Sequence, residues 1–446
     1  MDCLSYVALV ACRSNGKGFP LKITIVNQFC PPDLSPTARL IASLAQHRAE
    51  RDDHVTVVGG QGYTVRLQDA SETTNRVSAA ALLSSNQLSG VDIKHIWTPR
   101  LGKRTFFHRC IDYLVFYMLA CVTLLRLPQQ DVIICLTTPP LIAITGLIHK
   151  LFHHNARIIL WNMDCYPEVL ERAKTIRANG LIYRSISLFN RLVSTYLDHI
   201  VCLDPSMRDL LEARNDSKRC PISIIPNWEQ IDSFPPPAKV DRKGGNDEQP
   251  FTILYSGNMG HGHYFETLLA AAQITKRRTP SIRFVMTGGG VQADTLRQRI
   301  NKEQLDNIAF EGYVSTERLR IIQQTSHCAL ITLKDNMLGC MSPSKLHASL
   351  AMGLPILYLG PLESNIDDAV NAYQCGISLR QGDTEGLVDA LEMLASSQDI
   401  WHTFAKRSRH AFEDHYCDKK TLPLFDAIID STSLQSLKNS AKKNAA

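Results

Sequence analysis

The stretch SPSKLHASLAMGLPILYLG, residues 342–360, predicts a short helix followed by a buried strand. Ser342 can cap the first free amides, Pro343 suits the first helical position, and Gly353 suits the left-handed residue that ends a helix. Lys345 then lies in the first turn, where a cation faces the positive end of the helix dipole. Free amides, a hydroxyl and an ammonium together favour a phosphate site, and a solvated surface lysine is an alternative of equal weight.

Strands and helices alternate along the chain outside this stretch. Apolar runs that are typical of strands buried on both faces occur at 21–26, 54–60, 91–96, 131–135, 156–161, 199–202, 251–255, 282–286, 308–310, 328–333 and 356–359. Helical patterns separate most of them, which is the spacing of parallel β-α-β units. The sequence therefore predicts an α/β protein with two doubly wound, Rossmann-like domains that face a cleft.

The chain of 446 residues exceeds the length at which a single core stops growing, so two domains are expected. One segment near the middle is rich in proline, glycine and charge, has no apolar period and predicts the linker. The expected division is a tail at 1–20, a first domain at 21–230, the linker at 231–250, a second domain at 251–400, helices at 401–430 and a disordered tail at 431–446.

Composition excludes several classes of function. The net charge of +5 is modest for this length, and no basic stretch interleaved with aromatic residues indicates nucleic acid. The cysteines include no Cys-x-x-Cys pair, so neither a disulfide framework nor a zinc site is expected, and the chain fits a reducing cytoplasm. The most apolar run, 113–125, is shorter than the roughly 20 residues that a membrane-spanning helix needs, so no such helix is predicted.

No metal site and no cofactor are predicted. The sequence lacks Asp-x-Asp, the carboxylate pair that commonly holds a divalent ion against a diphosphate. His153-His154 and His261-x-His263 are more typical of surface or supporting positions than of ligand pairs, since neither has a thiol nearby. Without a metal, the charge of a leaving diphosphate must be met by amides, helix dipoles and basic side chains, and Lys345 is the natural candidate.

Two glycine clusters follow strands of the second domain. Gly257 and Gly260 lie in one turn with Asn258 and His263, and the run 288–290 closes the next strand. Glycines there let the backbone approach a diphosphate, although a glycine turn in an α/β protein is at least as often structural. Together with the stretch quoted above, three such elements are expected at the strand ends of one domain.

An acidic segment follows the strand at 156–161 in the first domain. Asp164 and Glu168 flank Pro167, and a carboxylate just past a buried strand points into the cleft. Asp164 could therefore orient an acceptor hydroxyl or take its proton. A helix cap before Pro167 is an alternative of equal weight.

Short segments in both halves carry a family resemblance. They are Pro31–Asp33, Thr137–Pro140, Met163–Glu168, Ile225–Trp228, Tyr255–Gly260, Thr287–Gly290, Phe310–Val314 and Pro343–Leu346. In this order and spacing they resemble the retaining nucleotide-sugar glycosyltransferases of the two-Rossmann GT-B fold, over nearly the whole chain. The chain is most similar to the capsule and colanic-acid-type subgroup whose signature is Pro-Ser-Lys-Leu.

The resemblance implies that a nucleotide-diphosphate sugar, a UDP-sugar above others, binds the second domain with its base near Tyr313 and Val314. The implied diphosphate contacts are Gly257, Asn258, Gly260, His263, Gly288, Gly289, Ser342, Ser344 and Lys345. The implied acceptor contacts in the first domain are Asp33, Ser35, Asp164 and Glu168. Final helices of the family often cross back to the first domain, which suits the helices at 401–430.

The sequence departs from the family at several charged positions. Cys340 and Ala348 stand where many members carry two glutamates, one for the donor sugar and one for the ribose. Asn258 and His263 stand where many members carry an arginine and a lysine. Glu363 is a candidate substitute carboxylate. The Pro-Ser-Lys-Leu subgroup commonly departs in similar ways, so an inactive enzyme is not inferred.

The expected function is transfer of a hexose or N-acetylhexosamine from a nucleotide-diphosphate sugar to a lipid-linked or growing glycan. The resemblance implies bacterial surface polysaccharide synthesis, with retention and without a metal. A nucleotide-sugar epimerase is the alternative among enzymes, although no convincing acid–base pair is present. A non-catalytic nucleotide-sugar-binding partner protein is the alternative outside enzymes, because the common glutamates are missing.

Contact with the inner face of the plasma membrane is a further hypothesis for this otherwise cytoplasmic chain. Arg100, Lys103, Arg104 and Arg109 precede the apolar run at 113–125. A basic cluster beside exposed apolar residues favours an anionic lipid surface. A buried helix is the simpler interpretation of the apolar run.

Overall fold

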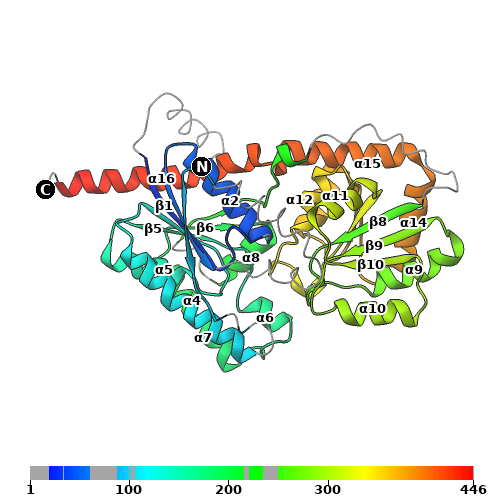
Figure 1. Cartoon of the computed structure of the whole chain (residues 1–446), viewed down its shortest axis with the longest axis horizontal. Coiled ribbons are helices and arrows are strands. Elements are labelled where there is room, and N and C mark those ends of the chain that lie inside the picture. The colour runs from blue at the N-terminus through cyan, green and yellow to red at the C-terminus, as the bar shows by residue number, and fades with distance from the viewer. Residues whose placement is uncertain are drawn as a thin grey trace, which may run out of the picture.

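The computed structural model of the protein describes residues 20–33, 35–60, 88–99, 101, 106–214, 220–234 and 250–444. These residues form two α/β domains that lie side by side, each built on a parallel sheet with helices packed against it (Figure 1). The predicted fold class is therefore confirmed. Most of the expected tail and linker, as well as Arg100, Lys103 and Arg104, lie outside the described residues.

The first domain contains a seven-stranded sheet in the order β3-β2-β1-β4-β5-β6-β7, with parallel pairing throughout. Its strands are β1 (Lys22–Asn27), β2 (His54–Gly60), β3 (Val91–Ile96), β4 (Val132–Cys135), β5 (Arg157–Trp161), β6 (His199–Cys202) and β7 (Ile222–Ile224). The strand order reverses between β1 and β4, and ligands of doubly wound sheets bind outside the carboxyl ends of the strands at such a point.

The second domain contains a six-stranded parallel sheet in the order β10-β9-β8-β11-β12-β13. Its strands are β8 (Phe251–Ser256), β9 (Ile282–Thr287), β10 (Ile308–Gly312), β11 (Cys328–Thr332), β12 (Ile356–Leu359) and β13 (Gly376–Leu379). The sequence predicted all of these strands except β13. That strand has four half-buried residues at the edge of the sheet, so it lacks the continuous apolar run of a central strand.

Helices connect the strands in both domains. In the first they are α2 (Pro36–Ala49), α4 (Phe106–Arg126), α5 (Ala143–Phe152), α6 (Glu168–Arg172), α7 (Leu181–Ser194) and α8 (Pro205–Ala213). In the second they are α9 (Glu266–Arg278), α10 (Ala293–Lys302), α11 (Thr316–Thr325), α12 (Lys345–Ala351), α13 (Asn365–Tyr373), α14 (Thr384–Ser396) and α15 (Gln398–Ala411).

The last helix, α16 (Asp418–Asn444), follows α15 after the π-helical turn Phe412–Tyr416 and returns to the first domain (Figure 1). Phe425 from this helix packs edge-on against two stacked tryptophans, with ring centroids 4.7 Å from Trp161 and 5.6 Å from Trp228. The expected disordered tail from Ser431 is instead helical up to Asn444. Once a helix has begun, each added residue gains a hydrogen bond, and no glycine or proline follows Ser431 to interrupt it.

The apolar run at 113–125 is part of α4, which is 21 residues long and extends beyond the run at both ends. Within α4, His108–Arg126 is long and apolar enough to cross a membrane by length and composition, and only 22% of this segment is buried in the protein. The interpretation of the run as a buried core helix therefore holds for one side of α4 only.

Candidate active site

Lys345, the first residue of α12, points toward the glycine turn that follows β8. Its Nζ lies 3.0 Å from His263 Nε2 and 3.4 Å from the carbonyl oxygen of Asn258. Removal of the ammonium from water lowers the pKa of Lys345 to about 7. Among the residues that the structure describes, no carboxylate pairs with this ammonium. The position therefore offers a cation whose charge is not neutralised to any anion that enters the turn.

His263 lies behind Lys345 and is only 2% exposed. Its Nδ1 lies 2.7 Å from the carbonyl oxygen of Thr332 at the end of β11. A carbonyl oxygen can only accept, so Nδ1 carries the ring proton and Nε2 offers its lone pair to Lys345. Burial and, secondly, the charge of Lys345 lower the pKa of His263 to about 3. The imidazole is therefore neutral at pH 7 and accepts a hydrogen bond from the ammonium.

The two glycine turns pack directly against each other and against Lys345. Gly257 has a φ of +127°, and a Cβ atom there would lie 2.9 Å from Lys345 Cε. Gly288 has a φ of +105°, and a Cβ atom there would lie 2.2 Å from the carbonyl oxygen of Gly257. A hydrogen bond of 2.6 Å from the Met259 amide to the Gly289 carbonyl joins the turns. A Cβ atom at Gly288 would overlap the backbone, and one at Gly257 would push against the Lys345 side chain, so the backbone itself forms the surface.

The remaining predicted donor contacts surround these turns. The Tyr313 ring follows β10, is 68% exposed, and lies so close to Gly289 that a Cβ atom there would be 2.4 Å from the ring. Val314 is half-buried beside it, and the Gly260 carbonyl accepts a hydrogen bond from the Gln292 side chain. An exposed aromatic face therefore adjoins the glycine turns at the strand ends.

The start of α12 differs from the prediction. The helix begins at Lys345, and neither Ser342 nor Ser344 caps it through its side chain. The Ser342 side chain instead lies beside the Asp204 carboxylate of the first domain, where it favours the ionised form of that carboxylate. The predicted end of the helix is correct, because Gly353 has a φ of +66° and its amide bonds back to the last turn. Contacts between the domains, which a local capping pattern cannot reveal, determine where the helix starts.

The segment before α12 pairs with the acceptor loop predicted in the first domain. Met341 and Asp164 form an antiparallel β-bridge. The Cys165 amide donates to the Cys340 carbonyl oxygen at 2.8 Å. These bonds bring the predicted base Asp164 to a chain segment that ends, four residues after Met341, at Lys345.

Asp164 itself is held by the backbone and leaves its carboxylate available. Its amide donates to Thr137 Oγ1 at 3.2 Å, and among the described residues no hydrogen bond reaches its carboxylate. Burial raises the pKa of Asp164 to about 6. Asp164, Tyr166 and Asn190 line a narrow pocket of about 40 Å³. That space is too small for a sugar, so an acceptor would have to lie outside this pocket.

Glu168 differs from Asp164 because its carboxylate is occupied. Arg214, which follows α8, donates to both carboxylate oxygens of Glu168, one of them at 2.9 Å. The sequence did not identify this arginine, because the two residues come from separate helices and share no motif. The ion pair holds the start of α6 against α8, so Glu168 fixes the loop that carries Asp164.

Asp33 and Ser35 form the turn at the start of α2. Asp33 is buried, and its Oδ1 accepts a hydrogen bond of 2.7 Å from the Ser35 amide. Ser35 Oγ then caps the helix by accepting from the Ala38 amide at 3.3 Å. Both predicted acceptor residues therefore have a structural role in this turn.

Glu363 lies in the turn before α13 with a φ of +60°. Its carbonyl oxygen accepts a hydrogen bond of 3.1 Å from Ser206 Oγ in the first domain. Cys340 is buried, and Ala348 lies within α12, so neither provides a charge. Within the described parts of the chain, no group of three or more histidine, cysteine or acidic residues is arranged to hold a metal ion.

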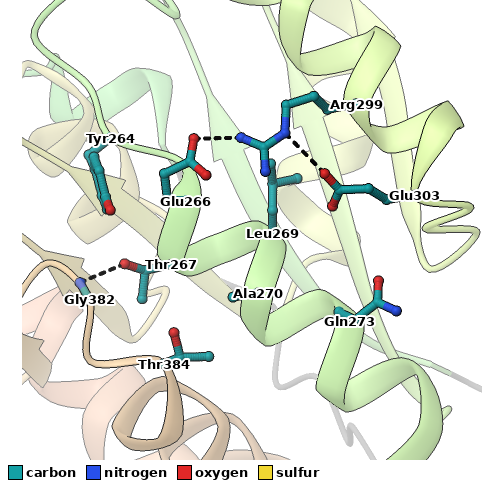
Figure 2. Close-up of a pocket in the computed structure, with 10 residues that line it drawn as sticks. All are labelled: Tyr264, Glu266, Thr267, Leu269, Ala270, Gln273, Arg299, Glu303, Gly382 and Thr384. Carbon is teal, nitrogen blue, oxygen red and sulfur yellow. Dashed lines mark hydrogen bonds and ion pairs between the residues drawn. The ribbon is translucent and has the colours of Figure 1, made fainter.

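A separate pocket of about 480 Å³ lies on the second domain, between α9, α10 and the turn before α14 (Figure 2). Arg299 bridges Glu266 at 2.5 Å and Glu303 at 3.1 Å on one side of it, and the Gly382 amide donates to Thr267 Oγ1 on the other. None of the predicted site residues lines this pocket, so it is distinct from the site around Lys345.

Comparisons with known proteins concern the family and the fold. Residues 238–411 match the family described as glycosyl transferases group 1. The chain is 23% identical over 271 residues to the probable glycosyltransferase WbjE of Pseudomonas aeruginosa. This alignment covers 58% of this chain and 65% of that protein. It is 27% identical over 137 residues to WcaI of Escherichia coli K12, a glycosyl transferase named for colanic acid biosynthesis, covering 30% of this chain and 33% of that protein. The chain therefore spans less than two thirds of the length of either relative.

The fold matches solved structures over almost its full length. Anabaena HepE, solved in complex with UDP and glucose, has a TM-score of 0.65 and 10% sequence identity, with coverage of 92% of this chain and 100% of that chain. Such low identity shows the shared fold alone. Residues 238–411 thus match the glycosyl transferases group 1 family, within a two-domain molecule that has the GT-B fold.

Proposed function

We propose that this protein is a glycosyltransferase of bacterial surface polysaccharide synthesis. It transfers a hexose or N-acetylhexosamine from a UDP-sugar to a lipid-linked or growing glycan, with retention of the anomeric configuration and without a metal. Its location is the cytoplasm, at the inner face of the plasma membrane. The capsule and colanic-acid-type subgroup is supported by the Pro-Ser-Lys-Leu signature and by the similarity to WcaI.

One observation carries this proposal. The bridge between Asp164 and Met341 joins the candidate acceptor loop to the segment that leads into Lys345. We expect the Asp164 carboxylate and the Lys345 ammonium, which come from different domains, to act on substrates bound beside these two segments, as transfer between two bound substrates requires. The binding of UDP and glucose by HepE, which shares the fold, supports the choice of donor class.

The proposed chemistry follows from these two groups. The acceptor hydroxyl oxygen forms a bond to the anomeric carbon on the same face of the sugar from which the β-phosphate oxygen departs, so that a single step keeps the anomeric configuration. UDP leaves with the electron pair, and Lys345 together with the backbone of the glycine turns stabilises its added charge. Asp164, which is ionised above about pH 6, takes the proton of the hydroxyl.

A panel of UDP-, GDP- and dTDP-sugars with the purified protein tests the proposal. We expect binding and turnover with UDP-sugars, also in the presence of EDTA, and an unchanged anomeric configuration in the product by NMR. Lys345→Ala is expected to lose transfer by about a hundredfold or more, as for removal of one oxyanion-stabilising donor, while the exposed control Lys406→Ala keeps it. Binding without turnover, with every acceptor supplied, would instead indicate a non-catalytic nucleotide-sugar-binding protein.

A further inference from the structure

Helix α4 carries apolar side chains on two opposite sides. One stripe, at Phe116, Ala120 and Leu124, is buried against the first domain together with the carboxylate of Asp112. The opposite stripe is exposed to between 37% and 63%, and consists of Leu114, Met118, Leu119, Val122 and Leu125. A helix on the surface of a soluble protein normally turns a polar face outward, and a helix that is apolar all round is normally covered on all sides. The outer side of α4 therefore lacks the cover that its composition requires.

Two neighbouring helices extend this exposed apolar surface. Helices α4, α5 and α7 lie side by side on the outer side of the first domain (Figure 1). Leu151 and Phe152 at the end of α5 are 68% and 69% exposed. On α7 and just after it, the side chains exposed to at least 50% are Leu181, Ile182, Leu188, Phe189, Leu192 and Tyr196. We call the surface formed by α4, α5 and α7 the three-helix face.

The charges on the three-helix face are of one sign. Arg109 and Arg126 on α4, and Arg184 and Arg191 on α7, are exposed and form no ion pair with a described residue. The sequences of α5 and α7 contain no acidic residue, and the acidic residue of α4, Asp112, is buried. Positive charge at the edges of an apolar surface complements a surface that is apolar inside and anionic outside.

We propose that the three-helix face docks on the surface of an anionic lipid bilayer. The apolar side chains enter the boundary between headgroups and acyl chains, and the four arginines contact the anionic headgroups. A second copy of the chain is a poorer occupant, because two such faces would bring unpaired arginines of like charge together. The partial burial of α4 in the domain core keeps this helix along the bilayer surface rather than across it.

The three-helix face also connects to the acceptor loop. Asn190 on α7 donates a hydrogen bond of 2.6 Å to the carbonyl oxygen of Tyr166. Tyr166, Asn190 and Asp164 line the same narrow pocket. Docking through α7 would therefore hold Asp164 near the bilayer, where the head of a lipid-linked acceptor lies. This last step rests on the proposed function, whereas the docking itself does not require transfer activity.

Flotation of the purified full chain with vesicles tests the proposal. We expect the protein to float with phosphatidylglycerol-containing vesicles at low salt, and much less with pure phosphatidylcholine. Met118→Glu with Val122→Glu, and separately Leu188→Glu with Phe189→Glu, should reduce the floated fraction. Arg184→Glu with Arg191→Glu should reduce it by about tenfold or more, because each arginine near an anionic surface contributes to binding. The matched control, Val291→Glu with Ile321→Glu, changes exposed apolar residues of the second domain and should float like the wild type.

Several results would overturn this proposal. The first is that the wild-type protein does not float with anionic vesicles at low salt. The second is that the variants of the three-helix face float like the wild type. The third is that the protein forms a dimer without lipid and that only these variants dissociate it. Far-ultraviolet circular dichroism checks folding, and the arginine variants, being surface changes, remain informative if an apolar variant misfolds. Donor turnover with a water-soluble acceptor is measured separately. Flotation that follows the expected pattern without turnover would reject the transferase and keep the docking surface. Turnover without flotation would keep the transferase and reject the docking surface.

Discussion

His263 Nε2 lies 3.0 Å from Lys345 Nζ, while the opposite nitrogen of the same ring lies 2.7 Å from the carbonyl oxygen of Thr332. The imidazole therefore joins the end of β11 to the ammonium at the start of α12. Lys345 is fixed by a neutral group, and its positive charge stays available to a ligand. The expected family resemblance places a basic residue at this position in many members. Here a neutral, buried histidine instead holds Lys345 in place.

Replacing His263 should weaken transfer without removing Lys345. His263→Leu leaves the ammonium without its acceptor, and a hydrogen bond to a charged group contributes about 1.5–3 kcal/mol, so kcat/KM should fall by roughly tenfold to a hundredfold. His263→Gln can keep both contacts, with the amide NH₂ on Thr332 and the amide oxygen on Lys345, and should recover much of the rate. Equal losses for both variants would assign His263 to packing alone. Steady-state kinetics with the donor varied provides the measurement.

Donor affinity should decrease as the pH rises through about 7. Lys345 has its pKa lowered to about 7, so its ammonium loses its proton in this range when the site is empty. A bound diphosphate favours the protonated form, so binding takes up a proton above this pH. His263, whose pKa is about 3, stays neutral throughout and cannot cause the effect.

Isothermal titration of UDP in two buffers with different ionisation enthalpies measures this proton uptake. Lys345→Arg keeps its charge and should show little uptake, since arginine is always protonated in this range. An affinity that is independent of pH in the wild type would contradict the assignment of Lys345 to the diphosphate.

Asp164 should set the acidic limb of the pH profile. Its pKa is raised to about 6 by burial, so below this pH the carboxyl is protonated and cannot accept the proton of the acceptor. Transfer should fall as the pH drops through about 6, and Asp164→Asn should lower the rate by about a hundredfold and abolish this limb. Asp209→Asn, on the exposed side of α8, is the control and should retain the wild-type profile. A limb that survives in Asp164→Asn would remove Asp164 from this role.

Two glycine substitutions separate backbone strain from displacement of Lys345. Gly257→Ala and Gly382→Ala both place a Cβ atom at positive φ, which costs about 1–2 kcal/mol of folding free energy. At Gly257 the new atom also meets Lys345 Cε at 2.9 Å, whereas at Gly382 nothing lies within 4 Å. Urea unfolding should show similar destabilisation, and only Gly257→Ala should lose transfer. Full activity in folded Gly257→Ala would show that the position of Lys345 is unimportant.

The ion cluster between α2 and α16 should be a major source of stability. Arg48 is 2% exposed and donates to Asp53 and Asp426 at 2.7 Å and to Asp430 at 3.1 Å. Arg48→Met leaves three carboxylates in a buried site, so unfolding free energy should fall by about 3–5 kcal/mol. Arg51→Met removes a 45% exposed arginine from the same carboxylates at 3.6 Å or more and should cost less than about 1 kcal/mol. Equal effects of the two variants in urea unfolding would contradict this difference.

The sequence predicted most of the fold because strands of a parallel sheet are buried on both faces and therefore have continuous apolar sequences. It missed β13, whose residues lie at a sheet edge and are only half-buried. It also placed the start of α12 at Ser342, since a capping residue followed by proline is a local signal. The position of Ser342 beside Asp204 depends on a contact between domains that no local pattern contains.

The site could be predicted in its parts but not in its connections. Lys345 and the glycines of the turns were identified from their residue types and positions after strands. The link from His263 to Lys345 and the ion pair of Arg214 with Glu168 join residues that are far apart in the sequence. Such pairs arise from side-chain directions in the folded chain, so a single sequence carries no spacing that would indicate them.

The contact of Phe425 with the stacked Trp161 and Trp228 has a consequence for how the protein is made. These rings belong to the core of the first domain, yet one of them enters the chain only after the whole second domain. A ribosome would therefore release nearly all of the polypeptide before that core could close. During synthesis the two tryptophans lack their contact with Phe425, and the earlier half of the protein reaches its final form only when the later half has already emerged.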